Sequence, residues 1–303
     1  MKAIIPVAGA GTKLRPHTYT QPKALIPLAG KTILSIIVDQ LHEAGIHEFI
    51  FIVGYLGEKI QDYVKDKYPH LTAHFVYQNE RYGIGHAILL TKEIVGDDEI
   101  FIVLGDTICE FDVKQVLETP HSTLGVKRVD DPRNFGVAEI DDHGAISRVV
   151  EKPQIPKSNM ALVGIYLIRE TSFLFTCLQN NIQNQLTSYG EYNLTDAIEC
   201  MIKNGAKFHS FKVQNWFDCG KKETLLEGAD ALCDNRVILT GKVGDTNHLL
   251  ILKNNENILD TAIYCDRCCG GSGDWRRHLL VCVFERGASI RLVHCHARHR
   301  QFE

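Results

Sequence analysis

The first 27 residues hold the side chains whose types and spacing point most clearly to chemistry. Gly9 and Gly11 come directly after Lys2–Ala8, which reads as a buried strand. Three cations follow in the same stretch: Lys13, Arg15 and Lys23. Glycines let backbone N–H groups approach phosphate oxygens closely because no Cβ intervenes. The pattern predicts a polyphosphate site, although two glycines alone also fit a tight turn and match neither common phosphate fingerprint.

Two aspartates lie more than a hundred residues apart, each close to a glycine and at the end of a strand-like run. Asp106 follows the apolar run Ile100–Leu104, and Asp218 comes shortly before Gly220. Ligands of open α/β sheets bind outside the carboxyl ends of the strands. Either aspartate alone would also fit as a helix cap or a turn residue. The place of Asp106 in the pattern makes it a candidate for ligand binding.

The elements that must position these residues alternate between strand-like runs and helical stripes up to about residue 235. This alternation predicts an α/β fold with a parallel or mostly parallel sheet. The expected strands are Lys2–Ala8, Glu48–Val53, His74–Tyr77, Ile100–Leu104, Thr123–Val129, Gly136–Ile140, Ile146–Val150, Met160–Ile168 and Lys207–Val213. The expected helices are Thr32–Ala44, Glu58–Lys67, His86–Ile94, Glu170–Leu178, Leu194–Lys203 and Lys222–Leu232. No repeat or low-complexity linker divides this stretch, so residues 1–235 are expected to form one domain.

Length and composition narrow the class of protein. A chain of 303 residues, 45% hydrophobic and 23% charged, can bury a real core. The net charge of −4 gives no reason to expect nucleic acid or an anionic membrane as a partner. No apolar run approaches the roughly 20 residues of a membrane span. The first five cysteines are scattered as buried free thiols usually are, so we expect a cytoplasmic protein.

The full string from Gly9 to Pro27 is far more specific than its two glycines. It reads Gly-x-Gly-Thr-(Lys/Arg)-Leu-x-Pro-x-Thr-x-x-x-Pro-Lys-x-Leu-x-Pro and resembles the signature of the sugar-1-phosphate nucleotidylyltransferases. Further pieces occur in the family's order: Tyr82–Ala87, Leu104–Asp106, Asn134–Val137, Val150–Pro153, Gly164–Tyr166, Glu191–Asp196 and Trp216–Gly220. The resemblance covers about three quarters of the chain. It implies a Rossmann-like three-layer sandwich with a mixed, mostly parallel central sheet, of the nucleotide-diphospho-sugar transferase type.

The resemblance also implies a role for each matching residue. Asp106 and Asp218 would hold Mg²⁺ between them, with phosphate oxygens and water completing the octahedron. The expected catalytic residues are Lys13, Arg15, Lys23, Asp106 and Asp218. The expected nucleotide-binding residues are Ala8, Gly9, Gly11, Thr12, Gln78 and Gly83, with Gln78 reading the base. The expected sugar-phosphate-binding residues are Gly136, Glu151, Lys152 and Tyr166, with Lys152 on the phosphate and Glu151 on sugar hydroxyls.

The implied substrates are a nucleoside triphosphate and a sugar 1-phosphate, which would react to a nucleotide sugar and pyrophosphate. Gln78 and the wording of the motifs favour dTTP or UTP with glucose 1-phosphate, and GTP with mannose 1-phosphate is the nearest rival. A non-catalytic regulatory subunit on the same fold is the rival of another class. It gains slight support from Lys13, because many family members have Arg there and Lys lacks the planar fork. An NAD(P)-dependent dehydrogenase is disfavoured by the missing third glycine. The sequence leaves a homo-oligomer open.

Residues 236–303 form a predicted C-terminal appendage of different character. Family members with a C-terminal extension often continue into a left-handed β-helix or end in short helices, and residues 236–264 are expected to begin such an appendage, as a truncated β-helix start. Residues 1–264 hold 19 Lys and 7 Arg, whereas residues 265–303 hold no Lys, 7 Arg and five of the cysteines. Three interpretations of residues 265–303 compete. Cys265-x-x-Cys268 has the spacing of a zinc site, whereas a disulfide cluster is disfavoured in a reducing cytoplasm. The third interpretation is out-of-frame translation, which would give such a composition. We favour the last hypothesis, which zinc analysis and intact mass would test.

Overall fold

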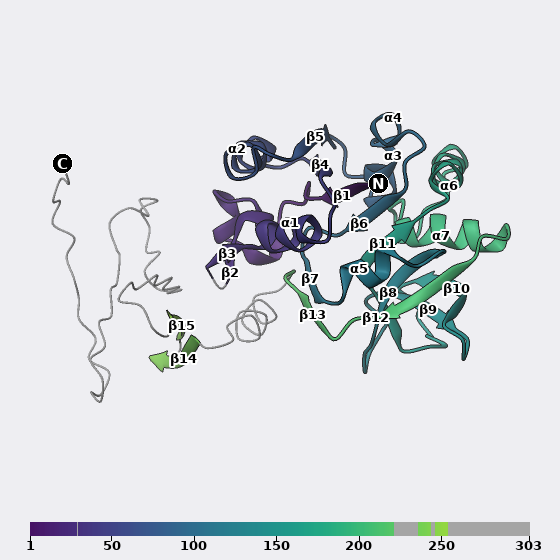
Figure 1. Cartoon of the computed structure of the whole chain (residues 1–303). Helices are drawn as coiled ribbons and strands as arrows, with labels where there is room; N and C mark the ends of the chain where they lie inside the picture. Colours follow the sequence, from purple (N-terminus) through teal and green to yellow (C-terminus); the bar gives the residue numbers. More distant parts are fainter. Residues whose placement is uncertain (29, 221–235, 244–245, 254–303) are drawn as a thin grey trace, which may run out of the picture. The chain divides into compact units, whose positions relative to one another are not determined.

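The computed structural model describes residues 1–28, 30–220, 236–243 and 246–253 (Figure 1). The chain divides into two units, Met1–Gly228 and Ala229–Glu303. The first unit is built on a nine-stranded sheet with the order β5-β4-β1-β6-β11-β8-β12-β10-β9. Its strands are β1 (Lys2–Pro6), β4 (Glu48–Val53), β5 (Thr72–Tyr77), β6 (Ile100–Val103), β8 (Ser122–Arg128), β9 (Gly136–Ile140), β10 (Ala145–Glu151), β11 (Met160–Ile168) and β12 (Phe208–Lys212). The predicted α/β class with a mixed sheet is confirmed.

The strands of this sheet run in both directions. Strands β5, β4, β1 and β6 run parallel, and so do β8 and β12, whereas β11 is antiparallel to β6 and to β8, and β10 is antiparallel to β12 and to β9. Seven of the nine strands therefore point in one direction and only β10 and β11 run against them, as expected for a mixed, mostly parallel sheet. The two reversed strands follow from the connections, because β8 to β11 follow one another through turns without helices, and a parallel pair needs a longer crossover.

Helices cover both faces of this sheet. They are α1 (Ile33–Glu43), α2 (Gly57–Lys67), α3 (Ile84–Leu89), α4 (Lys92–Val95), α5 (Val113–Leu117), α6 (Thr171–Gln183) and α7 (Leu194–Lys203). Helices α3, α6 and α7 share one buried cluster with Ile4, Ile50 and Ile102 of the central strands. Since successive residues of a strand point to opposite faces, Ile5 and Phe51 face the other layer. The buried stripe of α1 lies outside that cluster and packs in the other layer (Figure 1).

Several predicted elements differ in detail from the observed ones. The helix expected over His86–Ile94 is divided into α3 and α4, with a break at Thr91, whose hydroxyl donates to the Ile88 carbonyl. The sequence reading missed α5 and two short two-stranded sheets. These sheets are formed by β2 (Pro27–Leu28) with β3 (Lys31–Thr32) and by β7 (Thr107–Glu110) with β13 (Asn215–Asp218). The predicted helix Lys222–Leu232 lies outside the described residues.

The described part of the second unit is an antiparallel hairpin. Strand β14 (Arg236–Val243) pairs with β15 (Thr246–Lys253) along their full lengths. The β-helix start expected over residues 236–264 extends beyond these two strands and stays a prediction. The Cys- and His-rich residues 265–303 lie outside the described part of the chain.

A search of the described helices found none that combines the length and the apolar character needed to cross a membrane.

Candidate active site

Asp106 and Asp218 are brought together by the small sheet that sequence reasoning missed. Strand β7 begins one residue after Asp106, and Asp218 pairs with Thr107 in the antiparallel register between β13 and β7. The next backbone group continues the contact, because the Cys219 amide donates to the Asp106 carbonyl oxygen over 2.9 Å. In Figure 1 the two strands lie beside each other at one edge of the first unit. Two residues 112 positions apart in sequence thus become backbone neighbours.

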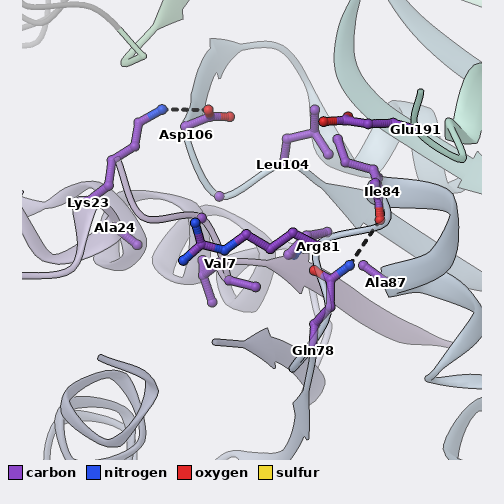
Figure 2. Close-up of a pocket in the computed structure, with 15 residues that line it drawn as sticks. Val7, Lys23, Ala24, Gln78, Arg81, Ile84, Ala87, Leu104, Asp106 and Glu191 are labelled. Atoms are coloured by element: carbon purple, nitrogen blue, oxygen red, sulfur yellow. Dashed lines mark hydrogen bonds and ion pairs between the residues drawn. The ribbon is translucent and has the colours of Figure 1, made fainter. Parts of the chain in front are cut away.

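Lys23 completes this group from the first loop. Its Nζ lies 2.5 Å from Asp106 Oδ2, and the Lys23 side chain is largely buried while Asp106 keeps 41% of its side chain exposed (Figure 2). Gly220 lies against both Asp218 and Lys23, because a Cβ added there would lie 2.7 Å from Asp218 Oδ1 and 3.5 Å from Lys23 Nζ. The Gly220 amide also donates to Asp218 Oδ1 over 2.8 Å. One cation and two carboxylates therefore share a small volume that any larger residue at position 220 would fill.

The donor set of this group suits a hard divalent cation. Mg²⁺ is usually bound by one or two carboxylates together with substrate phosphates and water, not by a complete protein cage. Asp106 and Asp218 supply two carboxylates of that kind. Among the described residues no group of three or more His, Cys, Asp or Glu is arranged to hold a metal ion. The remaining ligands of a cation at this place would have to come from a substrate or from water.

Gly105 fixes the turn that presents Asp106. Its amide donates to the Pro6 carbonyl over 3.2 Å, and a Cβ at this position would lie 2.3 Å from Val7 Cγ1 and 2.7 Å from the Pro6 carbonyl oxygen. We expect Gly105→Ala to lower the free energy of unfolding by about 1–3 kcal/mol through overpacking. Denaturant unfolding measures this change. Gly9→Ala is the matched control, since nothing lies within 4 Å of its added Cβ, and an equal loss there would contradict the explanation.

The glycine loop after β1 folds into a tight turn in front of Lys23. Gly11 has a φ of 59°, and a Cβ there would lie 2.8 Å from Thr18 Cγ2 and 3.0 Å from Lys23 Cβ. The Thr18 hydroxyl donates to the Gly11 carbonyl over 2.8 Å. This position therefore needs glycine both for its left-handed backbone and for the close approach. The other predicted residues of the loop, Thr12, Lys13 and Arg15, are exposed, and the Arg15 guanidinium lies 5.1 Å from the Tyr19 ring centroid.

A pocket of about 290 Å³ opens beside Lys23 and Asp106 (Figure 2). Six of the predicted residues line it: Ala8, Gly9, Lys23, Gln78, Gly83 and Asp106. The sequence reading missed several other lining residues, among them Arg81, Ile84, Ala87, Leu104 and Glu191. Arg81 and Glu191 stood within or next to recognised motifs, which was the available signal. The pocket joins the cationic loop to the predicted base-reading residue.

Gln78 is held in one orientation at this pocket. Its Nε2 donates to the Gly83 carbonyl over 3.0 Å and lies 3.4 Å from His86 Nδ1 (Figure 2). Burial lowers the pKa of His86, which favours the neutral ring whose Nδ1 can accept a hydrogen bond. With the amide nitrogen engaged in this way, the side-chain oxygen of Gln78 is left as a hydrogen-bond acceptor.

The predicted sugar-phosphate residues form a second group around the end of β10. Glu151 pairs with Gly136 in the β10–β9 register, and a Cβ at Gly136 would lie 3.3 Å from Glu151 Oε2. The buried Thr195 hydroxyl donates to the same Oε2 over 2.7 Å. Burial, with a contribution from the negative charge of Glu151, raises the pKa of Tyr166 above its usual range. Lys152 Nζ lies 3.5 Å from Glu151 Oε1.

The two groups are linked by the segment Glu191–Thr195. Glu191 lines the first pocket, and the Tyr192 carbonyl accepts from the Gly85 amide over 2.7 Å. At the other end of the segment, Thr195 holds Glu151. Of the predicted residues, Gly11, Thr12, Lys13, Arg15, Gly136, Glu151, Lys152, Tyr166 and Asp218 do not line the pocket itself. The structure therefore shows one pocket, one adjoining carboxylate pair and one neighbouring group of residues around Glu151 and Lys152.

The sequence and the fold were compared with known protein families and solved structures. Residues 2–235 match the family model described as nucleotidyl transferase. The fold is similar to that of UDP-glucose pyrophosphorylase in a structure complexed with UDP-glucose. The TM-score is 0.66 and the identity 25%, and the match covers 76% of this chain and 97% of that one. The fold predicted for residues 1–235 from their motifs thus agrees with a solved structure.

Curated relatives extend the comparison. The bifunctional protein GlmU of Methanocaldococcus jannaschii is 36% identical over 267 residues, which is 87% of this chain but only 61% of that protein. A glucose-1-phosphate thymidylyltransferase of Streptomyces griseus is 32% identical over 262 residues, covering 80% of this chain and 72% of that protein. With the family model matching most of its length and relatives of these kinds, the chain belongs to the nucleotidyl transferase family, among the sugar-1-phosphate nucleotidyltransferases.

Proposed function

We propose that the chain is a Mg²⁺-dependent enzyme that transfers a nucleotidyl group from a pyrimidine nucleoside triphosphate to a sugar 1-phosphate, releasing pyrophosphate. The observation that carries this proposal is the meeting of Asp106 and Asp218 across β7 and β13, with Lys23 beside them. Membership of the family supplies the reaction class. The favoured substrates are dTTP or UTP with glucose 1-phosphate, the sugar phosphate named in the Streptomyces griseus relative.

The charges of these residues can offset the electrostatic repulsion between the two substrates, which is the main barrier to this reaction. An oxygen of the sugar phosphate must attack the α-phosphorus in line with departing pyrophosphate, so two anions have to meet. Mg²⁺ held by Asp106 and Asp218 would neutralise phosphate charge and orient the triphosphate. The ammonium of Lys23, which pairs with Asp106 here, would be free to bind a phosphate oxygen when Asp106 holds a cation instead. On the other side, Lys152 would hold the sugar phosphate while Glu151 accepts from sugar hydroxyls.

The proposed choice of base rests on Gln78. Uracil and thymine offer one ring N–H between two carbonyls, and the free side-chain oxygen of Gln78 can accept from that N–H. We expect Gln78→Ala to raise the KM for dTTP or UTP about tenfold, since one buried hydrogen bond to the base is lost. Steady-state kinetics with both substrates varied would measure it. The matched control is Gln61→Ala on α2, where the amide donates to the Tyr77 hydroxyl. A larger effect on the sugar phosphate than on the nucleotide would count against the assignment.

One assay distinguishes the proposed function from its two rivals, a mannose-1-phosphate guanylyltransferase and a non-catalytic regulatory subunit. Pyrophosphate release is measured with dTTP, UTP, GTP, ATP and CTP, each combined with glucose 1-phosphate, mannose 1-phosphate and other sugar 1-phosphates, with and without Mg²⁺. The proposal expects fastest turnover with dTTP or UTP and glucose 1-phosphate, and loss of turnover when EDTA removes the metal. Turnover confined to GTP and mannose 1-phosphate would select the guanylyl rival. Nucleotide-sugar binding without turnover would select the regulatory subunit. A cytoplasmic location and a homo-oligomer stay predictions.

A further inference from the structure

Tyr189 stands at the tip of a tight turn in an uncommon backbone conformation. Ser188 and Glu191 exchange two backbone hydrogen bonds of 3.1 and 3.2 Å, and between them Tyr189 and Gly190 have φ values of 57° and 77°. Positive φ at both central residues defines a turn that usually takes Asn, Asp or Gly. A tyrosine at the first of these positions is unfavourable for the backbone. The residue is 60% exposed, so burial does not explain its presence.

The side chain of Tyr189 contacts Lys152 in two ways. Its hydroxyl donates to the Lys152 carbonyl oxygen. Its ring centroid lies 5.9 Å from Lys152 Nζ, within the range of a cation–π interaction. The same ammonium lies 3.5 Å from Glu151 Oε1, on the residue that Thr195 orients. The Lys152 head group is therefore placed between an aromatic ring and a fixed carboxylate.

Lys152 itself has a backbone that needs support. Its φ is 40°, although it is not glycine and although it precedes Pro153, a position that normally favours an extended backbone. Two hydrogen bonds hold this conformation from either side. The Lys152 amide donates to the Phe135 carbonyl over 3.0 Å, and the Lys152 carbonyl accepts from the Tyr189 hydroxyl. Loss of the second bond allows the residue to return toward the extended region, which re-aims its side chain.

We propose that Tyr189 is a positioning residue for Lys152, fixing both its backbone and its ammonium for binding of the sugar phosphate. This inference rests on the proposed function, in which Lys152 binds that phosphate. It assigns Tyr189 no contact with the reacting atoms. Its consequence is selective: sugar-phosphate binding depends on Tyr189, and nucleotide binding at the pocket around Gln78 does not.

The experiment compares the full-length chain with Tyr189→Phe, which keeps the ring, and Tyr189→Leu, which removes it. We expect Tyr189→Phe to raise the KM for the sugar 1-phosphate about three- to tenfold, from one lost hydrogen bond, with the KM for the nucleotide unchanged within about twofold. Tyr189→Leu should raise it further, because the cation–π contact is lost as well. In a Lys152→Ala background, Tyr189→Phe should add no further change.

The matched control is Tyr63→Phe. In helix α2 the Tyr63 hydroxyl accepts from Lys67 Nζ over 3.2 Å, and that ammonium lies 5.6 Å from the ring centroid, so a tyrosine with a hydroxyl hydrogen bond and a cation–π contact to one lysine also occurs away from the site. This variant should leave both KM values unchanged. An active wild type with an unaffected Tyr189→Phe would overturn the inference alone. So would an equal rise in both KM values, or an additive effect with Lys152→Ala. A wild type without turnover on any substrate pair would overturn the proposed function and this inference together.

Discussion

Replacing Asp218 by Asn should reduce kcat by about 100- to 1,000-fold, the effect of removing one preorganised electrostatic group from a transition state. The substitution keeps size and shape but removes a negative charge from the pair with Asp106. The Gly220 amide can still donate to the side-chain oxygen at position 218, so the local fold should persist. Pyrophosphate release at saturating substrate measures the effect, and Asp106→Asn should lose as much. Because both carboxylates are proposed to serve one cation, the double variant should be little worse than either single variant.

The control for these variants is Asp62→Asn. Asp62 is exposed on α2 and has no part in the proposed site. Its kcat should equal that of the wild type. Thermal unfolding of each variant separates lost chemistry from lost folding. An Asp218→Asn enzyme within tenfold of wild type would mean that the second carboxylate is not needed.

Replacing Lys23 by Met should produce the second-largest loss, about 100-fold in kcat/KM for the nucleotide. The Met side chain retains the apolar stem that lies in the pocket wall but has no ammonium to bind a phosphate oxygen. Lys23→Arg should recover only part of the loss, because the planar guanidinium is longer and differently directed. Initial rates with the nucleotide varied give the constants. The loss should fall on the nucleotide and leave the KM for the sugar 1-phosphate nearly unchanged.

The chain offers a matched ion pair as the control for Lys23. Lys31 Nζ lies 2.7 Å from Asp39 Oδ2 in an exposed pair outside the pocket. Exposed pairs of this kind contribute about 1 kcal/mol or less to stability, so Lys31→Met should change neither stability nor kinetics much. If Lys31→Met and Lys23→Met lowered activity equally, general destabilisation would explain both.

Elements with a strong local period could be predicted from the sequence almost to the residue. Strand β4 (Glu48–Val53), strand β11 (Met160–Ile168) and helix α7 (Leu194–Lys203) have the predicted bounds. Strands β7 and β13 could not be predicted in the same way. Each has only four residues, and they stabilise each other across more than a hundred positions. Short strands of this kind depend on tertiary pairing, which a local pattern does not record.

The residues of the candidate site could be predicted from the sequence, whereas the contacts between them could not. Motif spacing singled out Lys23, Asp106 and Asp218, and the structure brings all three together. The contacts that orient these three side chains could not be predicted from spacing, as the hydrogen bond from the Gly220 amide to Asp218 Oδ1 illustrates.

The central claim is that Asp106 and Asp218 share one divalent cation when substrate is bound. Electron paramagnetic resonance of Mn²⁺, titrated into the chain with a non-hydrolysable nucleoside triphosphate analogue, tests it most directly. The wild type should bind one Mn²⁺ in the ternary complex, and Asp106→Asn and Asp218→Asn should each raise its Kd at least about tenfold, as expected for losing one of two carboxylate ligands. Unchanged Mn²⁺ affinity in either variant would contradict the claim.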